Sequence, residues 1–169
     1  MLACKTKYLS HLAVAIFATA AFVSCFDHIG FYEYHAIDID GWERNDFTDF
    51  NIPSAASSGY YTEIIGVRVN ADYPFRTLDL IVEQNIISTT QAGRNFFKRD
   101  TMRLAIYDED GRIYGTGVNL HQMEIPYKTI RLEKGDSIYM KIRHNMSRRR
   151  VKGISDIGLK VYLPPSSAD

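Results

Sequence analysis

The residue with the clearest chemical role in this sequence is Cys25, whose thiol directly follows an N-terminal apolar run. The first seven residues contain two lysines and no acidic residue, and the uninterrupted apolar run covers residues 12–23. A basic start, an apolar run and a small residue before a cleavage point are the parts of a secretory signal. The run is too short for a membrane-spanning helix, which needs about 20 apolar residues. We therefore expect residues 1–24 to be removed and Cys25 to become the first residue of the mature protein.

The four residues that end in Cys25 indicate what this thiol would carry. Phe22-Val23-Ser24-Cys25 resembles the lipobox of bacterial lipoproteins, in which the cysteine takes up diacylglycerol, although Phe replaces the usual leucine. The alternative is an ordinary secretory signal that ends in a cysteine by chance. A single acyl chain holds a protein at a membrane only marginally, so stable anchoring needs several chains, such as palmitate, on Cys25. Because Cys4 leaves with the signal, the mature chain can form neither a disulfide nor a thiolate metal site.

A second group of residues with a chemical role is basic. Arg148, Arg149, Arg150 and Lys152 lie together, with Arg143 upstream, in a chain that has 20 basic and 20 acidic residues. Adjacent guanidinium groups repel one another, so the cluster is either a solvated loop or a docking patch for carboxylates or phosphates, on an acidic protein or on lipid headgroups. A net charge this close to zero argues against a nucleic-acid-binding protein.

Two short motifs are candidates for covalent modification. Asp100-Thr101-Met102 and Asp136-Ser137-Ile138 resemble the Asp-(Ser/Thr)-aliphatic acceptor motif for O-glycans on exported Bacteroidota proteins. Thr101 and Ser137 would then carry the sugar. The alternative is that both motifs are simply strand edges, because three-residue patterns often occur by chance.

No pattern in the chain indicates catalysis or a bound cofactor. The mature histidines are single and widely spaced, and no residue stands in a nucleophile motif, so we expect neither a metal site nor an enzyme. Asp108, Asp110 and Gly111 resemble the start of a calcium loop, but the later ligands are missing, and we prefer a hairpin turn. Gly111, Gly115 and Gly117 have the spacing of a dinucleotide fingerprint without the helix that should follow, so we interpret them as turn or bulge positions.

The elements that must position these residues are strands. Apolar and polar residues alternate with a period of two, which is typical of strands that bury one face, and no long segment has a helical period. About eight short strands are expected, at residues 31–39, 48–52, 65–69, 78–82, 101–106, 127–132, 138–143 and 159–163. Many short strands with one apolar face each predict an antiparallel β-sandwich, in which two such faces enclose one core.

Turns and termini set the expected domain boundaries. Asp72-Tyr73-Pro74, residues 108–111 and residues 134–136 favour chain reversal, and residues 147–157 are expected to hold one helical turn. We expect four parts: a signal at 1–24, the lipidated cysteine and a short tether at 25–30, the sandwich domain at 31–163 and a disordered tail at 164–169.

Several segments of the mature chain resemble one known family, the gliding-motility lipoproteins GldH of Bacteroidota. They are residues 68–78 with a Tyr-Pro turn, residues 111–117 with spaced glycines, residues 142–146 followed by 153–161, and residues 34–42, which end in Gly-Trp. Each segment also has a structural interpretation: a turn at Tyr73-Pro74, backbone reversals at Gly153 and Gly158, and a core anchor at Trp42. The resemblance runs over most of residues 25–163.

This resemblance implies a non-enzymatic envelope lipoprotein needed for surface gliding, working with other Gld lipoproteins and with the type IX secretion machinery. It implies no catalytic residues, and we expect an anchor in the outer membrane. Asp27 is the one acidic residue in the segment just after Cys25, so we favour the periplasmic face over the cell surface. A glycan-binding module is the alternative, since sandwiches with exposed aromatic residues commonly hold sugars, and Tyr60, Tyr61 and Tyr114 are its candidate residues.

Overall fold

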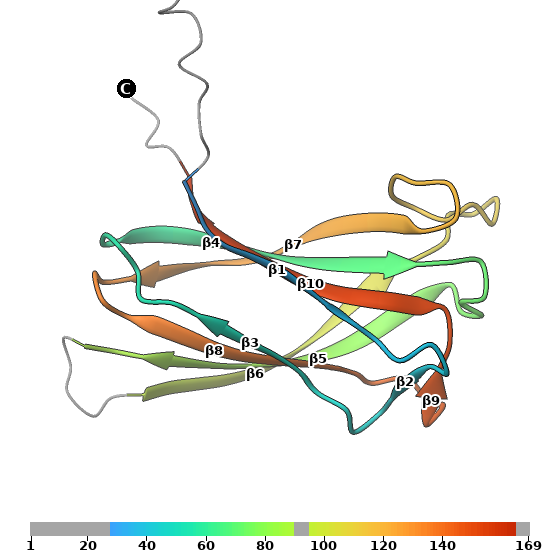
Figure 1. The fold of residues 1–169 in the computed structure, drawn as a ribbon, viewed down its shortest axis with the longest axis horizontal. Helices are drawn as coiled ribbons and strands as arrows, with labels where there is room; N and C mark the ends of the chain where they lie inside the picture. Colours follow the sequence, from blue (N-terminus) through green and yellow to red (C-terminus); the bar gives the residue numbers. More distant parts are fainter. Residues whose placement is uncertain (1–27, 90–94, 165–169) are drawn as a thin grey trace, which may run out of the picture.

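Strands make up the regular structure of the described chain, as Figure 1 shows. The computed structural model describes residues 28–89 and 95–164, so Cys25, the expected signal and residues 165–169 of the expected tail lie outside the described residues. The described residues contain no helix, and their strands are β1 (His28–Ala36), β2 (Trp42–Glu43), β3 (Thr48–Ile52), β4 (Gly59–Val69), β5 (Thr77–Ile87), β6 (Asn95–Ala105), β7 (His121–Leu132), β8 (Ser137–His144), β9 (Arg150–Val151) and β10 (Ile154–Leu163).

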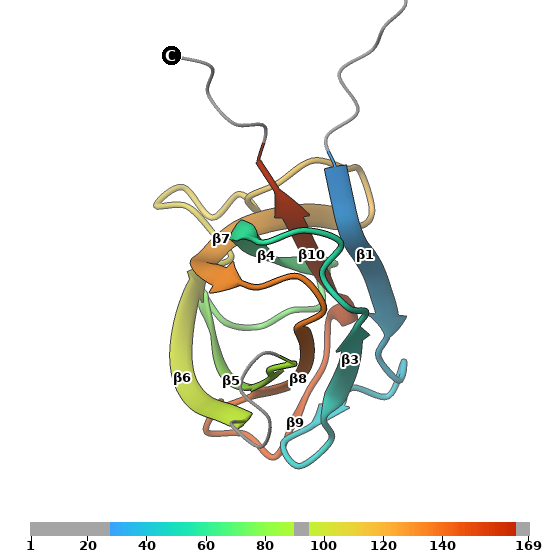
Figure 2. The same ribbon diagram turned by 90° about the vertical axis from the view of Figure 1, so that its left-hand side faces the viewer.

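The strands form the antiparallel β-sandwich that the alternating pattern predicts. One sheet has the strand order β1-β10-β4-β7, the other has the order β3-β8-β5-β6, and β2 and β9 form a small third sheet. All of these strand pairs are antiparallel. The two four-stranded sheets face each other, as the view in Figure 2 shows. The prediction of an all-β sandwich is therefore confirmed.

The core lies between the two four-stranded sheets and is built from the apolar residues that alternate along the strands. In β4, the side chains of Ile65, Val67 and Val69 are fully buried, whereas Arg68 between them is half-buried. Burying one such aliphatic side chain contributes about 1.5–3 kcal/mol to stability. The facing sheet contributes fully buried residues in the same way, namely Phe50, Leu78, Leu80, Val82, Met140 and Ile142.

The expected helical turn at residues 147–157 is wrong. These residues instead contain β9 and the start of β10, and none of them is helical. β9 pairs with β2, so that Val151 lies opposite Trp42, and Gly153 then reverses the chain with a φ of 84°. Pairing with strands far away in the sequence overrides a weak local preference for helix.

Several strands are longer than the alternation predicts. β4 starts at Gly59, β5 continues to Ile87 and β6 starts at Asn95. These extensions pair with a neighbouring strand over their whole length, although many of their side chains are half-buried or exposed. Strand pairing is made by hydrogen bonds between backbone groups, which do not depend on burial of the side chains. A strand can therefore extend beyond the residues in which apolar and polar side chains alternate.

The predicted chain reversal at Gly158 is also wrong, because this glycine lies inside β10. Tyr34, Gly158 and Gly66 are in register on three neighbouring strands. The Tyr34 side chain lies across both glycines: an added Cβ would be 2.1 Å from its hydroxyl at Gly66 and 2.6 Å from its ring at Gly158. The glycines therefore make room for an aromatic side chain on the outer face of this sheet.

The two ends of the sandwich contain different elements, and most of the candidate residues lie at one end or the other. One end contains the start of β1 at His28, the end of β10 and the turns at 53–58 and 133–136; we call it the tether end, because the expected tether 25–30 leads into it. The opposite end, called the distal end, contains the β2–β9 sheet and the loop 106–120. β4 runs between the ends with 11 residues, which corresponds to about 35 Å. Figure 1 shows the start of β1 toward the left and β9 at the right.

Candidate docking site at the distal end

The predicted docking patch lies at the distal end, in the connection between β8 and β10. Arg143 is the second-last residue of β8, Arg148 and Arg149 lie in the loop that follows, Arg150 opens β9, and Lys152 comes directly after it. Arg143 is half-buried and the other four are exposed. The structure therefore brings all five basic residues to one end of the sandwich.

Glu43 of β2 neutralises part of the charge of this patch. Its Oε1 lies 2.7 Å from Arg150 Nε, and its Oε2 lies 3.3 Å from Arg149 Nε. The hydrogen bond from Arg150 lowers the pKa of Glu43 below its ordinary value, and the charge of Arg149 acts in the same direction. The charges of Asp40 and Asp38 also act on Arg150, whereas the Arg149 side chain stays 89% exposed and accessible to a partner.

The loop that carries Arg148 and Arg149 is fixed by Arg44, which sequence reasoning did not single out. The Arg44 Nη2 atom donates to the backbone oxygen of Met146, at 2.7 Å, and to that of Ser147. The Arg44 backbone N–H donates to the Arg149 carbonyl at 2.8 Å. These bonds connect residues about a hundred positions apart, so no local pattern could reveal them. A loop held in this way loses little conformational entropy when it binds a partner.

Trp42 and His144 form the buried floor beneath the patch. Trp42 is 2% exposed, donates from Nε1 to the Asp46 carbonyl at 2.9 Å, and packs edge-on against His144 at 5.5 Å. His144 Nε2 donates to the Trp42 carbonyl at 3.0 Å, and Nδ1 accepts from the Met146 N–H at 3.3 Å, which fits a neutral ring. Burial lowers the pKa of His144, so the ring is uncharged at neutral pH. The prediction that Trp42 is a core anchor is confirmed.

Two arginines of the patch lie on aromatic rings. Arg148 lies over the Phe75 ring at 5.4 Å from its centroid, and Arg143 lies over the Phe47 ring at 5.5 Å. A guanidinium group on a ring keeps its N–H edge available for a planar carboxylate or phosphate. The patch thus presents guanidinium groups on a fixed support, which is an arrangement that can bind an anionic surface.

The two candidate modification sites lie in different surroundings. Thr101 is exposed on β6, which is the edge strand of its sheet. Ser137 is half-buried and opens β8, and the preceding Asp136 is buried with both carboxylate oxygens in use. These oxygens accept from the backbone N–H groups of Thr89 and Glu133, each at 3.0 Å. The side chain of Thr101 is therefore the more accessible of the two.

The acidic and glycine residues of the loop 106–120 form turns, as predicted. Asp108 accepts at Oδ1 from the Arg112 N–H at 2.8 Å, and Gly111 adopts a φ of 81°. Gly115 and Gly117 also have positive φ values, of 94° and 144°, which only glycine adopts without strain. Within residues 28–89 and 95–164, no group of three or more His, Cys, Asp or Glu is placed to hold a metal ion.

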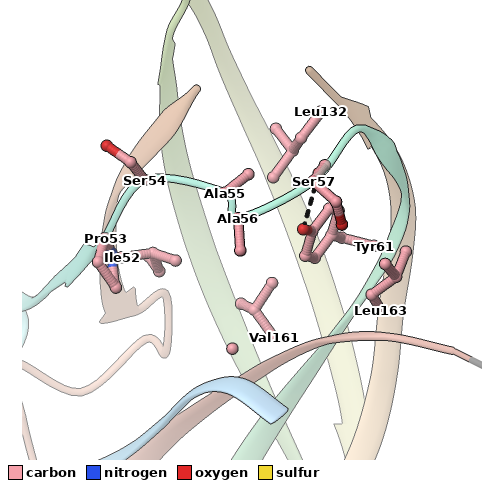
Figure 3. A pocket seen from close by; sticks show the side chains of 11 residues that line it. Ile52, Pro53, Ser54, Ala55, Ala56, Ser57, Tyr61, Leu132, Val161 and Leu163 are labelled. Atoms are coloured by element: carbon pink, nitrogen blue, oxygen red, sulfur yellow. Dashed lines mark hydrogen bonds between the residues drawn. The ribbon is translucent and has the colours of Figure 1, made fainter. Parts of the chain in front are cut away.

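A pocket of 530 Å³ lies between the sheets at the tether end. Figure 3 shows Ile52, Leu132, Val161 and Leu163 around it, and residues 53–57 crossing over it. The hydroxyl of Tyr61 in this lining already donates to the Ser57 carbonyl at 2.9 Å. A lining that is mostly aliphatic suits an apolar group better than a sugar, which needs several polar partners.

The three tyrosines proposed for glycan binding do not form one surface. Tyr61 is buried in the core, with 7% of its surface exposed. Tyr60 is exposed at the tether end of β4, whereas Tyr114 is exposed in the loop 106–120 at the distal end. The structure therefore gives no aromatic platform from these residues.

The fold and its surfaces define a small β-sandwich domain with a cluster of exposed arginines at one end. Comparison with protein families identifies a match to the GldH lipoproteins over residues 30–161. The chain belongs to the GldH lipoprotein family, as the resemblance of its separate segments predicts.

Two individual matches accompany the family match. The gliding motility lipoprotein GldH of Flavobacterium johnsoniae is 24% identical over 160 residues, which cover 90% of this chain and 96% of the relative. A solved structure of infectious bursal disease virus, Gx strain, is 12% identical, covers 83% of this chain and 35% of the virus chain, and has a TM-score of 0.32. The chain spans only about a third of that virus protein, and a similarity this low carries no argument.

Membership of this family makes the chain a GldH-type gliding motility lipoprotein of the cell envelope. The relative is named for gliding motility and not for an enzymatic activity. In the part of the chain that the structure describes, no helix is long and apolar enough to cross a bilayer.

Proposed function

We propose that this protein is a non-enzymatic lipoprotein of the outer membrane whose distal end docks an acidic surface of another envelope protein. Acyl chains on Cys25 hold it in the membrane, with the domain in the periplasm. Its partner belongs to the gliding and type IX secretion machinery, which includes other Gld lipoproteins. The observation that carries the proposal is the fixed cluster of Arg148, Arg149 and Arg150 at the end opposite the anchor.

The position of the anchor favours a protein partner over lipid headgroups. β1 begins at His28, three residues before the expected domain start at 31 and three residues after Cys25. The arginines lie at the other end of strands such as β4, whose 11 residues extend about 35 Å. Charges interact weakly beyond about 8–10 Å in physiological salt, so in a domain that stands upright on its tether end the patch does not reach the headgroups around its own anchor.

Removing the three arginines is expected to weaken the partner complex without unfolding the domain. Arg148→Ser, Arg149→Ser and Arg150→Ser together delete the guanidinium groups and the ion pairs to Glu43. Exposed ion pairs contribute little to stability, so the thermal midpoint should change by a few degrees at most. Co-purification from detergent-solubilised membranes should return the partner at about tenfold lower yield, and added salt should weaken the wild-type complex.

The control for this experiment removes the same charge elsewhere. Arg99→Ser, Arg131→Ser and Lys134→Ser delete three exposed basic side chains on β6, on β7 and in the turn 133–136, all away from the distal end. This variant should keep the partner at the wild-type yield. Equal retention by both triple variants at low salt would show that Arg148–Arg150 form a solvated loop, and recovery of polysaccharide alone would support the glycan-binding alternative.

Covalent glycosylation is expected at Thr101, and to a smaller extent at Ser137, because the Thr101 side chain is more exposed. Intact mass spectrometry of the protein from its own host should give a mass above that of the lipidated polypeptide. Thr101→Ala should remove most of the added mass. A native mass equal to the lipidated polypeptide alone would rule out the glycan at both residues.

A further inference from the structure

The pocket between the sheets at the tether end combines a large volume with an apolar inner wall. Its volume is 530 Å³, and buried side chains such as Ile52, Leu132 and Val161 form its inner wall. Exposed small residues, among them Gly30 and Ala56, form its rim, and Figure 3 shows Ala56 above Val161. Protein interiors leave few voids larger than a water molecule. An open apolar pocket of this size has the volume of a small-molecule binding site.

The chemistry of the lining selects an uncharged, apolar ligand. None of the lining residues, all of which belong to the described part of the chain, carries a charge. The Tyr61 hydroxyl already donates to the Ser57 carbonyl at 2.9 Å, so this donor is in use. Two pockets at the distal end are different, because aspartates line one and Arg76 and Glu109 line the other. The uncharged pocket thus lies at the end into which the expected tether leads.

Cys25 lies within reach of this pocket. Gly30 of β1 lines the pocket and follows Cys25 by five residues. An extended chain covers at most about 3.6 Å per residue, so the two residues are at most about 18 Å apart. An acyl chain spans about half of the roughly 30 Å hydrocarbon core of a bilayer, which is about 15 Å. An acyl chain on Cys25 therefore approaches the rim even when the tether is nearly straight, and enters the pocket when the tether takes a shorter path.

We propose that this pocket binds one acyl chain of Cys25, while the remaining chains of the same residue hold the protein in the bilayer. The inference rests on the proposed lipid anchor. Diacylglycerol supplies two acyl chains, and the amino group that signal cleavage exposes on Cys25 can carry a third. Two chains are sufficient for stable anchoring, so one is available for the pocket.

Covalent attachment favours this chain over other lipids. Each methylene that moves from water into an apolar site contributes about 0.8 kcal/mol, whichever lipid it belongs to. A short flexible linker, however, keeps a tethered ligand at an effective concentration in the millimolar range. The pocket and the bilayer are both apolar, so the chain can move between them at little cost in hydrophobic free energy. Binding holds the tether end at the membrane surface, and the arginine patch then points away from it.

Photo-crosslinking of the full-length protein in the membranes of its own host tests this proposal. Cells are fed a fatty acid with a diazirine on its chain, which enters lipoproteins and phospholipids, and the isolated membranes are irradiated. Peptide mass spectrometry of the wild-type protein should show the Cys25 lipopeptide joined to residues 52–61 or 161–163, in a product of monomer mass. Ala56→Trp fills the rim of the pocket and should lower the yield of this crosslink about tenfold, which corresponds to about 1.4 kcal/mol.

A matched control places the same substitution at the distal end. Ala71→Trp changes an exposed alanine between β4 and β5 and should keep the wild-type yield of the crosslink. The wild-type map decides the question even if Ala56→Trp does not fold.

The other outcomes separate this inference from the anchor. A labelled Cys25 that is joined to phospholipids alone would overturn the inference, although the anchor stands. Phospholipid adducts on residues 52–61 without the Cys25 lipopeptide would also overturn it, because the pocket then holds a lipid of the bilayer. Absence of label from Cys25 would overturn both the anchor and the inference.

Discussion

Replacing Cys25 by Ala is expected to remove this protein from the mature membrane fraction. Without the thiol no diacylglycerol can be attached, so the chain should remain an uncleaved precursor or become soluble. Each buried methylene of an acyl chain contributes about 0.8 kcal/mol to membrane binding, so the loss of several chains should lower the mature membrane-bound fraction by far more than tenfold.

Metabolic labelling with radioactive palmitate measures this effect directly. Wild-type protein should carry the label, and Cys25→Ala should carry none. Cys4→Ala is the matched control, because it removes the other cysteine of the chain, which lies inside the expected signal. Its labelling and fractionation should equal those of the wild type. Persistent labelling of Cys25→Ala would show that the lipid is attached elsewhere.

The next largest effect is expected on the pH dependence of stability, and it comes from Glu63, a buried acidic residue between the two sheets. Gln84 donates to its Oε1, but Oε2 has no hydrogen-bond partner among the described residues, and the side chain is fully buried. Burial raises the pKa of Glu63 from 4.5 to about 7, against the opposing charge of Lys128 and the hydrogen bond from Gln84. The folded protein therefore holds this carboxyl in its protonated form under mildly acidic conditions.

The sign of the resulting pH dependence follows from proton binding. In the unfolded chain Glu63 ionises near pH 4.5, so between pH 4.5 and pH 7 the folded state binds more protons than the unfolded state. The contribution of Glu63 to the free energy of unfolding therefore falls as pH rises through this window, by about 3 kcal/mol, and levels off above it. Asp100 lies nearby, but the hydrogen bond from Tyr127 lowers its pKa below 3.8, outside this window.

Urea unfolding of the purified protein at pH 5 and pH 8 checks this expectation. The stability difference between pH 5 and pH 8 should differ by about 3 kcal/mol between wild type and Glu63→Gln, which cannot ionise. The net wild-type difference is smaller than the Glu63 contribution, because His144, whose pKa burial lowers below 6.5, acts in the opposite direction at pH 5. Glu109→Gln removes an exposed acid in the loop 106–120 and should keep the wild-type difference. The same pH dependence in wild type and Glu63→Gln would contradict the role of this residue.

Much of the core could be predicted from the sequence because the alternation of side chains is a local property. Ile65, Val67 and Val69 had to share one face of a strand, and the structure buries all three. The turn at Asp108 and the glycines after it could be predicted for the same reason, since a turn depends on a few adjacent residues. The helical turn expected near Arg150 failed because that segment is shaped by pairing with β2.

Sequence alone determined the fold class, the likeness to the GldH lipoproteins and the candidate anchor at Cys25, because each depends on residue types in local order. Tertiary structure alone decided that the arginine patch lies at the end opposite the start of β1, that Glu43 and Arg44 contact it, and that Glu63 is buried. Those relations join residues far apart in the chain. These contacts form only when strand pairing and sheet packing bring the residues together. No pattern among neighbouring residues of the sequence predicts them.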